Sequence, residues 1–223
     1  LIQEQNVIAG ITNKILSRFV DIVAVGYKDA EASFSKAKRV VYTGNPVRPD
    51  VLVDTRADGR NYFNLSDDTF TVLIAGGSRG ARTINNAMID VHKHFQGTKG
   101  IKLIHITGDG EYKSVLSQLG ITDGDGLGDS SVILPYLHDM PKALAAADLA
   151  VFRSGAIGLA ELAVRGIPSV LVPYPYAAED HQTYNARIFV QEGAAHMIVD
   201  QMLSAHDLIG EIEMFMANRD LLS

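Results

Sequence analysis

Short apolar runs recur along this chain of 223 residues, and longer segments with helical spacing separate them. Most runs are apolar on both faces, which is typical of parallel strands covered by helices on each side. Strands are expected at residues 22–25, 40–42, 71–75, 102–106, 132–134, 149–152, 169–172 and 196–199. Helices are expected at 81–94, 156–165, 180–191 and 205–217. This alternation predicts an α/β fold with a doubly wound parallel sheet.

The segment 43–50 interrupts the alternation. It contains Gly44, Pro46 and Pro49, and the residue before each proline is disfavoured in helical conformation. The segment that follows, as far as Asp68, is polar. We therefore predict a domain boundary near Asn45, with residues 1–45 as the tail of one domain and 46–223 as most of another.

Composition restricts the classes of function. The net charge of −6 gives no basic footprint for a nucleic-acid partner. The absence of cysteine excludes disulfides and cysteine-type zinc sites. The sequence contains no run of about 18 apolar residues, so it predicts no membrane-spanning helix. Because the chain opens with Leu1 inside a strand-like segment, we expect it to be part of a longer protein.

The strongest local signal is the turn Gly76-Gly77-Ser78-Arg79-Gly80-Ala81, between an expected strand and an expected helix. This arrangement presents free backbone N–H groups to an anion, and the Ser78 hydroxyl and the Arg79 guanidinium suit a diphosphate. A tight turn with no ligand is the alternative. The glycine spacing does not match the dinucleotide pattern, and the lysine of a nucleoside-triphosphate loop is missing.

Two further polar turns follow expected strands. Arg153-Ser154-Gly155-Ala156 precedes a helix that carries Glu161, whose carboxylate could accept hydrogen bonds from ribose hydroxyls or could simply be solvated. The segment 173–185 gathers Asp180, His181, Gln182 and Asn185, which suit sugar hydroxyls; alternatively, Asp180 caps the helix and the others are solvated. All three turns lie at the carboxyl edge of the expected sheet, where open parallel sheets bind ligands.

Taken in order, these motifs resemble the UDP-GlcNAc:lipid I N-acetylglucosaminyltransferases of peptidoglycan synthesis, which have two domains of GT-B fold. The resemblance spans nearly the whole chain. It rests on Glu4-Gln5-Asn6, Ala9-Gly10, Thr12-Asn13, Gly44-Asn45-Pro46-Val47-Arg48, the turn at 76–81, Arg153–Ala156 with Glu161, and Asp180-His181-Gln182 with Asn185. It implies that residues 1–45 end the acceptor domain and that 46–223 form the UDP-GlcNAc-binding domain, incomplete at its end.

The resemblance also implies roles for single residues. Arg48, Ser78 and Arg79 would hold the diphosphate, and the backbone at Leu137 would meet the uracil. Ala156 and Ile157 would face the nucleotide and the sugar, and Glu161 would bind the ribose. His181 and Gln182 would bind the GlcNAc hydroxyls, with Asn185 beside them. Asn6 would contact the sugar or the acceptor. Gln3 stands where many members have a histidine, and Gly158 stands where some members have a threonine.

The implied reaction is displacement of UDP with inversion by the acceptor C4 hydroxyl, without a cofactor or metal, because helix N-termini and Arg48 would stabilise the departing charge. Asp123-Gly124-Asp125 offers an alternative metal-dependent reading. The family's glycine-rich loop with its candidate base, a histidine, is not in this sequence. The isolated chain is therefore expected to bind donor without transfer; measurable transfer would direct attention to Glu4 or His181.

The implied partners are UDP-GlcNAc, the lipid I acceptor and the cytoplasmic membrane surface. The family's membrane-facing patch lies on the other domain, so peripheral attachment to the cytoplasmic face is expected through that domain. Two alternatives remain. A UDP-GlcNAc epimerase of GT-B fold would share the donor turns but not Glu4-Gln5-Asn6 or the motif at 44–48. A non-catalytic sugar-nucleotide-binding module would need a partner chain.

Overall fold

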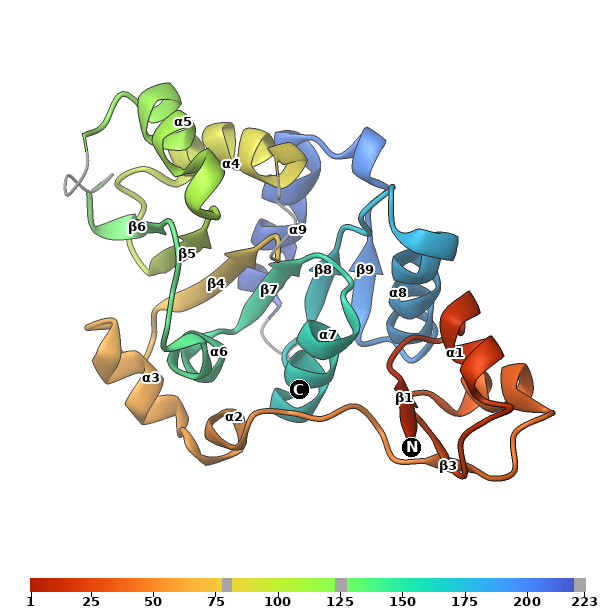
Figure 1. Cartoon of the computed structure of the whole chain (residues 1–223). Coiled ribbons are helices and arrows are strands. Elements are labelled where there is room, and N and C mark those ends of the chain that lie inside the picture. The colour runs from red at the N-terminus through yellow and green to blue at the C-terminus, as the bar shows by residue number, and fades with distance from the viewer. Residues whose placement is uncertain (78–81, 123–127, 219–223) are drawn as a thin grey trace.

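A six-stranded parallel sheet forms the centre of the protein (Figure 1). The structure is a computed structural model that describes residues 1–77, 82–122 and 128–218. The strand order is β6-β5-β4-β7-β8-β9. The strands are β4 (Phe70–Ala75), β5 (Ile101–Ile106), β6 (Ser131–Leu134), β7 (Leu149–Phe152), β8 (Ser169–Leu171) and β9 (Ala195–Met197). All neighbouring pairs are parallel, so the predicted doubly wound sheet is confirmed.

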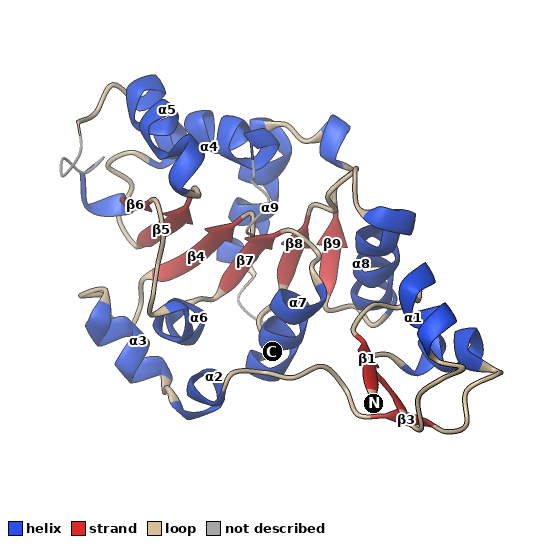
Figure 2. Cartoon of the chain, in the orientation of Figure 1, coloured by secondary structure: helices blue, strands red, loops and turns tan. Residues whose placement is uncertain are grey.

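Helices cover both faces of this sheet (Figure 2). Alternate residues of β4 point to opposite faces: Val72 and Ile74 belong to one buried cluster, and Leu73 and Ala75 to the other. Helices α4 (Arg82–Phe95) and α9 (Ala205–Ala217) bury apolar residues in the first cluster. Helices α2 (Pro49–Val53), α6 (Met140–Ala146), α7 (Ala156–Arg165) and α8 (His181–Gln191) contribute to the second. Strands apolar on both faces are the natural result.

Several helices were not expected from the sequence. Helices α2 and α3 (Arg56–Tyr62) occupy the polar segment after the predicted boundary, and α5 (Asp109–Leu119) follows β5. Their signals are local ones. Thr55 and Asp58 form a reciprocal capping box at α3, and α5 ends at Gly120, which is left-handed. Helix α6 was also missed.

A second, three-stranded parallel sheet contains β1 (Ile2–Glu4), β2 (Val23–Val25) and β3 (Val40–Tyr42), in that order. Helix α1 (Ile11–Leu16) and the 3₁₀ helix η1 (Lys28–Phe34) connect the strands, and a small core forms around Phe34. This sheet lies before Asn45 and the larger sheet after it. The domain boundary near Asn45 stays a prediction.

Short 3₁₀ helices complete the described chain: η2 (Gly128–Ser130), η3 (Ala178–Asp180) and η4 (Asp200–Met202). Within residues 1–77, 82–122 and 128–218, no helix combines the length and the apolar character needed to cross a bilayer.

The chain winds outward in both directions from β4 and β7, which pair at the centre of the sheet. From β4 it proceeds to β5 and β6 on one side, and from β7 to β8 and β9 on the other. In open parallel sheets, the carboxyl ends of two such central strands border a crevice that binds ligands. The turns after β4 and β7 are the first two polar turns singled out in the sequence.

Candidate functional site

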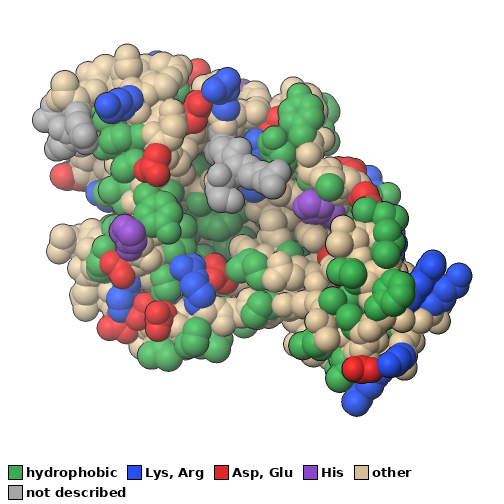
Figure 3. Space-filling model, viewed as in Figure 1, with side chains coloured by type: hydrophobic (Ala, Val, Ile, Leu, Met, Phe, Trp, Pro, Cys, Tyr) green, Lys and Arg blue, Asp and Glu red, His purple; other side chains and the backbone are tan. Residues whose placement is uncertain are grey.

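A cavity of about 540 Å³ opens at the carboxyl ends of β4 and β7. This volume lies within the range of small-molecule sites. In Figure 3 this face of the molecule is hollowed, with hydrophobic side chains inside and charged side chains near the rim. The lining includes Arg48, Ala75, Gly76, Gly77, Ile106, Tyr136, Leu137, Met140, Phe152, Arg153, Gly155, Gly158, Glu161, Tyr174, Tyr176, His181 and Gln182. All three polar turns therefore contribute to one site.

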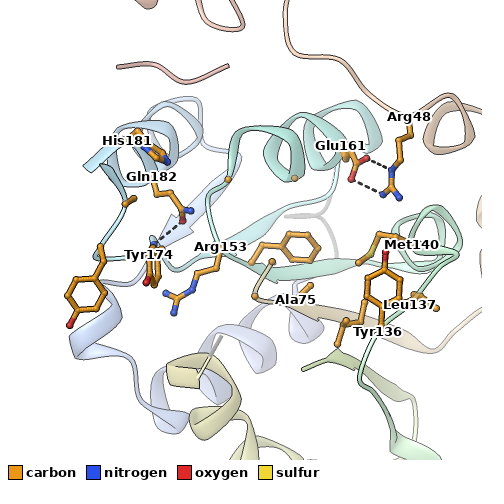
Figure 4. A pocket seen from close by; sticks show the side chains of 18 of the residues that line it. Arg48, Ala75, Tyr136, Leu137, Met140, Arg153, Glu161, Tyr174, His181 and Gln182 are labelled. Carbon is orange, nitrogen blue, oxygen red and sulfur yellow. Dashed lines mark hydrogen bonds and ion pairs between the residues drawn. The ribbon is translucent and has the colours of Figure 1, made fainter. Parts of the chain in front are cut away.

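Arg48 and Glu161 are joined at one end of this cavity (Figure 4). Arg48 Nε donates to Glu161 Oε1 at 2.7 Å, and Arg48 Nη2 donates to Glu161 Oε2 at 3.1 Å. Glu161 is 6% exposed, so it is not the solvated helix residue of the alternative interpretation. The hydrogen bonds and the charge of Glu161 raise the pKa of Arg48. In Figure 4 the pair lies on the side of Leu137 and Met140.

Arg153 supplies a second guanidinium to the cavity wall. It is 7% exposed, forms an ion pair with Asp200, and donates from Nη1 to the carbonyl oxygens of Val172 and Pro173 at 3.1 and 3.2 Å. Its Cζ lies 5.6 Å from the centre of the Tyr174 ring. Its buried Nε has no hydrogen-bond partner among the described residues. Arg153 belongs to one of the motifs found in the sequence but had no predicted role, although an arginine directly after a central strand is a visible signal.

The third polar turn closes the other end of the cavity. Gln182 Oε1 accepts a hydrogen bond from the Tyr174 backbone N–H at 2.9 Å, which orients the amide nitrogen of Gln182 for donation. His181 Nδ1 lies 2.7 Å from the carbonyl oxygen of Ala178. Because a carbonyl can only accept, Nδ1 carries the proton, and Nε2 of the neutral ring is an acceptor. These groups are suited to hydroxyl ligands.

Asp180 does not cap α8 with its side chain, contrary to one of the two sequence interpretations. Its backbone is left-handed, with φ of 54°, and so is that of Glu179, with φ of 53°. Non-glycine residues seldom adopt this conformation. The Asp180 carboxylate instead accepts a hydrogen bond from the Thr183 hydroxyl at 2.6 Å.

The other expected site residues divide into four groups, of which three are described first. Leu137 lines the cavity and is 8% exposed. Ala156 and Ile157 begin α7, but the wall there consists of Gly155 and Gly158. Ser78, Arg79 and the Asp123-Gly124-Asp125 motif lie outside the described residues.

Asn6 and Asn185 contact each other rather than the cavity. Asn185 is fully buried; its Nδ2 donates to Asn6 Oδ1 at 3.0 Å and to the Ser154 carbonyl at 3.2 Å. Its Oδ1 accepts from the Val7 backbone N–H at 3.0 Å. Together with the 3.8 Å ion pair of Lys14 and Glu179, these contacts join residues 1–45 to the larger sheet beside the Ser154 turn.

Glu4 organises the turn that carries Asn6. Its Oε1 accepts hydrogen bonds from the Asn6 backbone and side-chain nitrogens at 3.0 and 3.2 Å. Its Oε2 accepts from Gly10 N and Asn13 Nδ2, both at 2.9 Å. Burial alone would raise the pKa of the Glu4 carboxyl, but the hydrogen bonds from Asn6, Asn13 and Gly10 bring the pKa below its usual value. Such a carboxylate is a weak proton acceptor, which argues against Glu4 as a general base.

Within 1–77, 82–122 and 128–218, no three His, Asp or Glu side chains form a cluster that could hold a metal ion.

A family model for the glycosyltransferase family 28 C-terminal domain matches residues 71–222, which include both central strands and most of the cavity wall. The chain belongs to this family. Among curated relatives, the N-acetylglucosamine transferase of Desulforamulus reducens, named for UDP-N-acetylglucosamine and N-acetylmuramyl-(pentapeptide) pyrophosphoryl-undecaprenol, is 42% identical over 224 residues. That alignment covers 100% of this family 28 chain and 60% of the relative.

A solved structure supports the same assignment. MurG of Acinetobacter baumannii matches with a TM-score of 0.71 and 26% identity, over 99% of this chain and 58% of MurG. These findings confirm the resemblance and the GT-B fold inferred from the motifs. The UDP-N-acetylglucosamine 2-epimerase, described as putative, from Listeria monocytogenes matches with a TM-score of 0.60 over 91% of this chain and 53% of its own. At 13% identity, that likeness concerns the fold alone. The family 28 chain spans about 60% of the length of the relatives it matches.

Proposed function

We propose that this chain is the donor-binding part of an inverting glycosyltransferase that moves N-acetylglucosamine from UDP-GlcNAc to lipid I, forming lipid II. The observation that carries the proposal is the cavity at the central strands of a family 28 domain, walled by all three polar turns. The names of the curated relatives give the donor and the acceptor. The complete protein would act as a peripheral protein at the cytoplasmic face of the membrane.

The nucleoside end of the donor fits the side of the cavity formed by Leu137, Met140 and Glu161. Arg48 occupies one lone pair on each Glu161 oxygen, and the remaining lone pairs can accept both ribose hydroxyls. In this arrangement Arg48 fixes the orientation of the Glu161 carboxylate. Arg48 can make its predicted contact with the diphosphate only if its ion pair with Glu161 separates, or if the guanidinium contacts both Glu161 and the diphosphate.

The diphosphate fits between the Gly76-Gly77 turn and Arg153. Glycines at that turn let the backbone approach a phosphate closely. Arg153 is held by Asp200 and by two carbonyl groups, so its charge needs little rearrangement when a ligand arrives. His181 and Gln182 then face the sugar.

In the proposed reaction, the acceptor C4 hydroxyl oxygen forms a bond to the anomeric carbon as the bond from that carbon to the diphosphate oxygen breaks. The electron pair of the broken bond leaves with UDP, and the hydroxyl proton passes to a base. Guanidinium groups and backbone N–H groups stabilise the charge that develops on UDP. Glu4 is a poor candidate for the base, because hydrogen bonds occupy its carboxylate.

Calorimetry on the 223-residue chain tests the donor assignment. We expect UDP-GlcNAc to bind more tightly than TDP- and GDP-sugars, because the base edge meets the backbone near Leu137. Addition of EDTA should leave the affinity unchanged. Equal affinity for GDP-sugars would overturn the proposal, and loss of binding on chelation would revive the metal reading of Asp123-Gly124-Asp125.

Assays of the complete protein test the reaction. We expect transfer of GlcNAc to lipid I, with no transfer by the 223-residue chain alone. Conversion of UDP-GlcNAc to its 2-epimer would identify the epimerase alternative instead. Donor binding without either reaction in the complete protein would identify a binding module.

A further inference from the structure

A chain of buried polar side chains crosses the interface between α4 and the sheet. Asn85 in the first turn of α4, His92 further along it, and His105 on β5 are all fully buried. Asn85 Nδ2 donates to the Thr107 carbonyl at 3.0 Å, and Asn85 Oδ1 lies 2.9 Å from His105 Nε2. His105 Nδ1 lies 3.0 Å from His92 Nε2, and His92 Nδ1 lies 2.9 Å from Ser131 Oγ.

Donor–acceptor rules fix which atom donates and which accepts in every hydrogen bond of this network. The Thr107 carbonyl can only accept, so the Asn85 amide nitrogen faces it and Asn85 Oδ1 accepts from His105 Nε2–H. His105 Nδ1 is then an acceptor, which requires His92 to carry its proton on Nε2. His92 Nδ1 in turn accepts from the Ser131 hydroxyl. Every bond is satisfied with both imidazoles neutral.

Apolar packing does not require this network. Ile84, Met88, Val91 and Phe95 already attach α4 to the core. Burying polar groups gives less stability than apolar side chains of similar volume, but a fully satisfied network fixes one arrangement of its elements. Hydrophobic contacts alone would tolerate small sliding movements of the helix.

The ends of the network identify what is fixed. Thr107 directly follows Ile106, which lines the donor cavity. A separate hydrogen bond also holds the first turn of α4: the Thr83 hydroxyl donates to Asp200 Oδ2 at 3.0 Å. Asp200 is the partner of Arg153, which also lines the cavity. Polar side chains thus connect the first turn of α4 to two parts of the cavity wall.

We propose that Asn85 is a positioning residue for the donor site: by bridging Thr107 and His105, it holds the first turn of α4 in register with the carboxyl end of β5, beside the turn after β4 where the diphosphate is proposed to bind. The inference rests on the proposed function and adds a residue that does not itself line the cavity. A misplacement of about 1 Å can cost an enzyme about a hundredfold in rate, and hydrogen bonds to a ligand likewise weaken steeply when their geometry is disturbed. The uridine end of the cavity is formed by Leu137, Met140 of α6 and Glu161 of α7, and we expect it to be insensitive to Asn85.

The test compares UDP with uridine on the 223-residue chain by calorimetry. The dissociation constant of uridine divided by that of UDP isolates the contribution of the diphosphate to binding. Asn85→Ala is expected to reduce this ratio about tenfold or more while the uridine affinity stays within about threefold. Asn85→Asp keeps an acceptor for His105 but loses the donor to Thr107, so we expect the same reduction. Ser131→Ala cuts the far end of the network and serves as the matched control with an unchanged ratio.

An unchanged ratio in Asn85→Ala or Asn85→Asp, or an equal loss of UDP and uridine affinity, would overturn the inference. Failure of the wild-type chain to bind UDP would overturn the proposed function itself, and this is visible before any variant is made. If a variant does not fold, ¹⁵N spectra of the wild-type chain decide. UDP should shift the Asn85 side-chain amide signal more than uridine does, and identical shifts would overturn the inference.

Discussion

Arg48 and Glu161 are 113 positions apart in the chain, yet they form a two-pronged ion pair at the donor cavity. The two partners are unequally buried: the side chain of Glu161 is 7% exposed and that of Arg48 is 47% exposed. The carboxylate therefore depends on the guanidinium more than the guanidinium depends on the carboxylate. This inequality separates the effects of replacing each residue.

Replacement of Glu161 by alanine should weaken donor binding. The ribose hydroxyls would lose their acceptor, and a hydrogen bond to a charged group contributes about 1.5–3 kcal/mol, equivalent to about a ten- to hundredfold change in affinity. Alanine favours helix, so α7 should persist. Calorimetry with UDP on a variant shown to be folded by circular dichroism provides the measurement. An unchanged affinity would show that Glu161 does not bind the ribose.

Replacement of Arg48 by alanine should lower the free energy of unfolding more than replacement of Glu161 does. Arg48→Ala leaves a buried carboxylate without its partner, whereas Glu161→Ala leaves a guanidinium that can reach water. We expect a loss of about 1–3 kcal/mol for Arg48→Ala. Urea unfolding of both variants and of Arg48→Ala/Glu161→Ala measures it. The double variant should be more stable than Arg48→Ala alone; the reverse order would contradict this account.

The buried histidine pair should make the protein sensitive to acid. Burial lowers the pKa of His92 from 6.5 to about 4, and burial together with the neighbouring His92 lowers the pKa of His105 well below 6.5. Both rings bind protons more readily in the unfolded chain. Their contribution to stability is therefore complete above pH 6.5 and is lost as the pH falls toward 4. For His92 alone, the loss by pH 4 is about 3 kcal/mol.

Urea unfolding between pH 7 and pH 4.5 would detect this loss, with His206→Gln as a control because His206 is exposed. The control should retain the full pH dependence of the wild type. Imidazole ¹⁵N signals of His92 and His105 that titrate near pH 6.5 in the folded protein would contradict the prediction.

Replacement of Glu4 by glutamine should destabilise the protein by about 1–3 kcal/mol, because an amide NH₂ would then face N–H donors that now point at a carboxylate oxygen. Glu192→Gln, at an exposed position, serves as the matched control. The measurement is again urea unfolding at pH 7. Unchanged stability of Glu4→Gln would remove the structural role and restore Glu4 as a candidate base.

The sequence predicted the sheet well because its strands are apolar on both faces and therefore stand out against polar turns. It predicted less of the helical layer. Helix α3 has a polar sequence and was not predicted as a helix, although the Thr55–Asp58 capping box marks its start. Helix α5 was overlooked although Gly120 marks its end. These signals are short and have little weight without a strong apolar period.

Single candidate residues were easier to find than their partners. The turns at the carboxyl edge of the sheet pointed to Glu161 and Gln182, and the family resemblance pointed to Arg48; all three line the cavity. The pairing of Arg48 with Glu161 joins segments far apart in the sequence, and no local pattern encodes it. The contact of Asn6 with Asn185 is hidden for the same reason.

The turn held by Glu4 has a consequence for how this part of the chain becomes ordered. Helix α1 has six residues, no side-chain cap at Gly10 and no acidic residue in its first turn. Isolated helices shorter than about 12–15 residues are marginal in water. Glu4 places its negative charge beside Gly10, at the positive end of the helix dipole, a position that stabilises a helix by about 0.3–1 kcal/mol. Strand β1 thus provides the charge that α1 lacks, and the strand end, the Asn6 turn and the helix should gain or lose order as one cooperative unit.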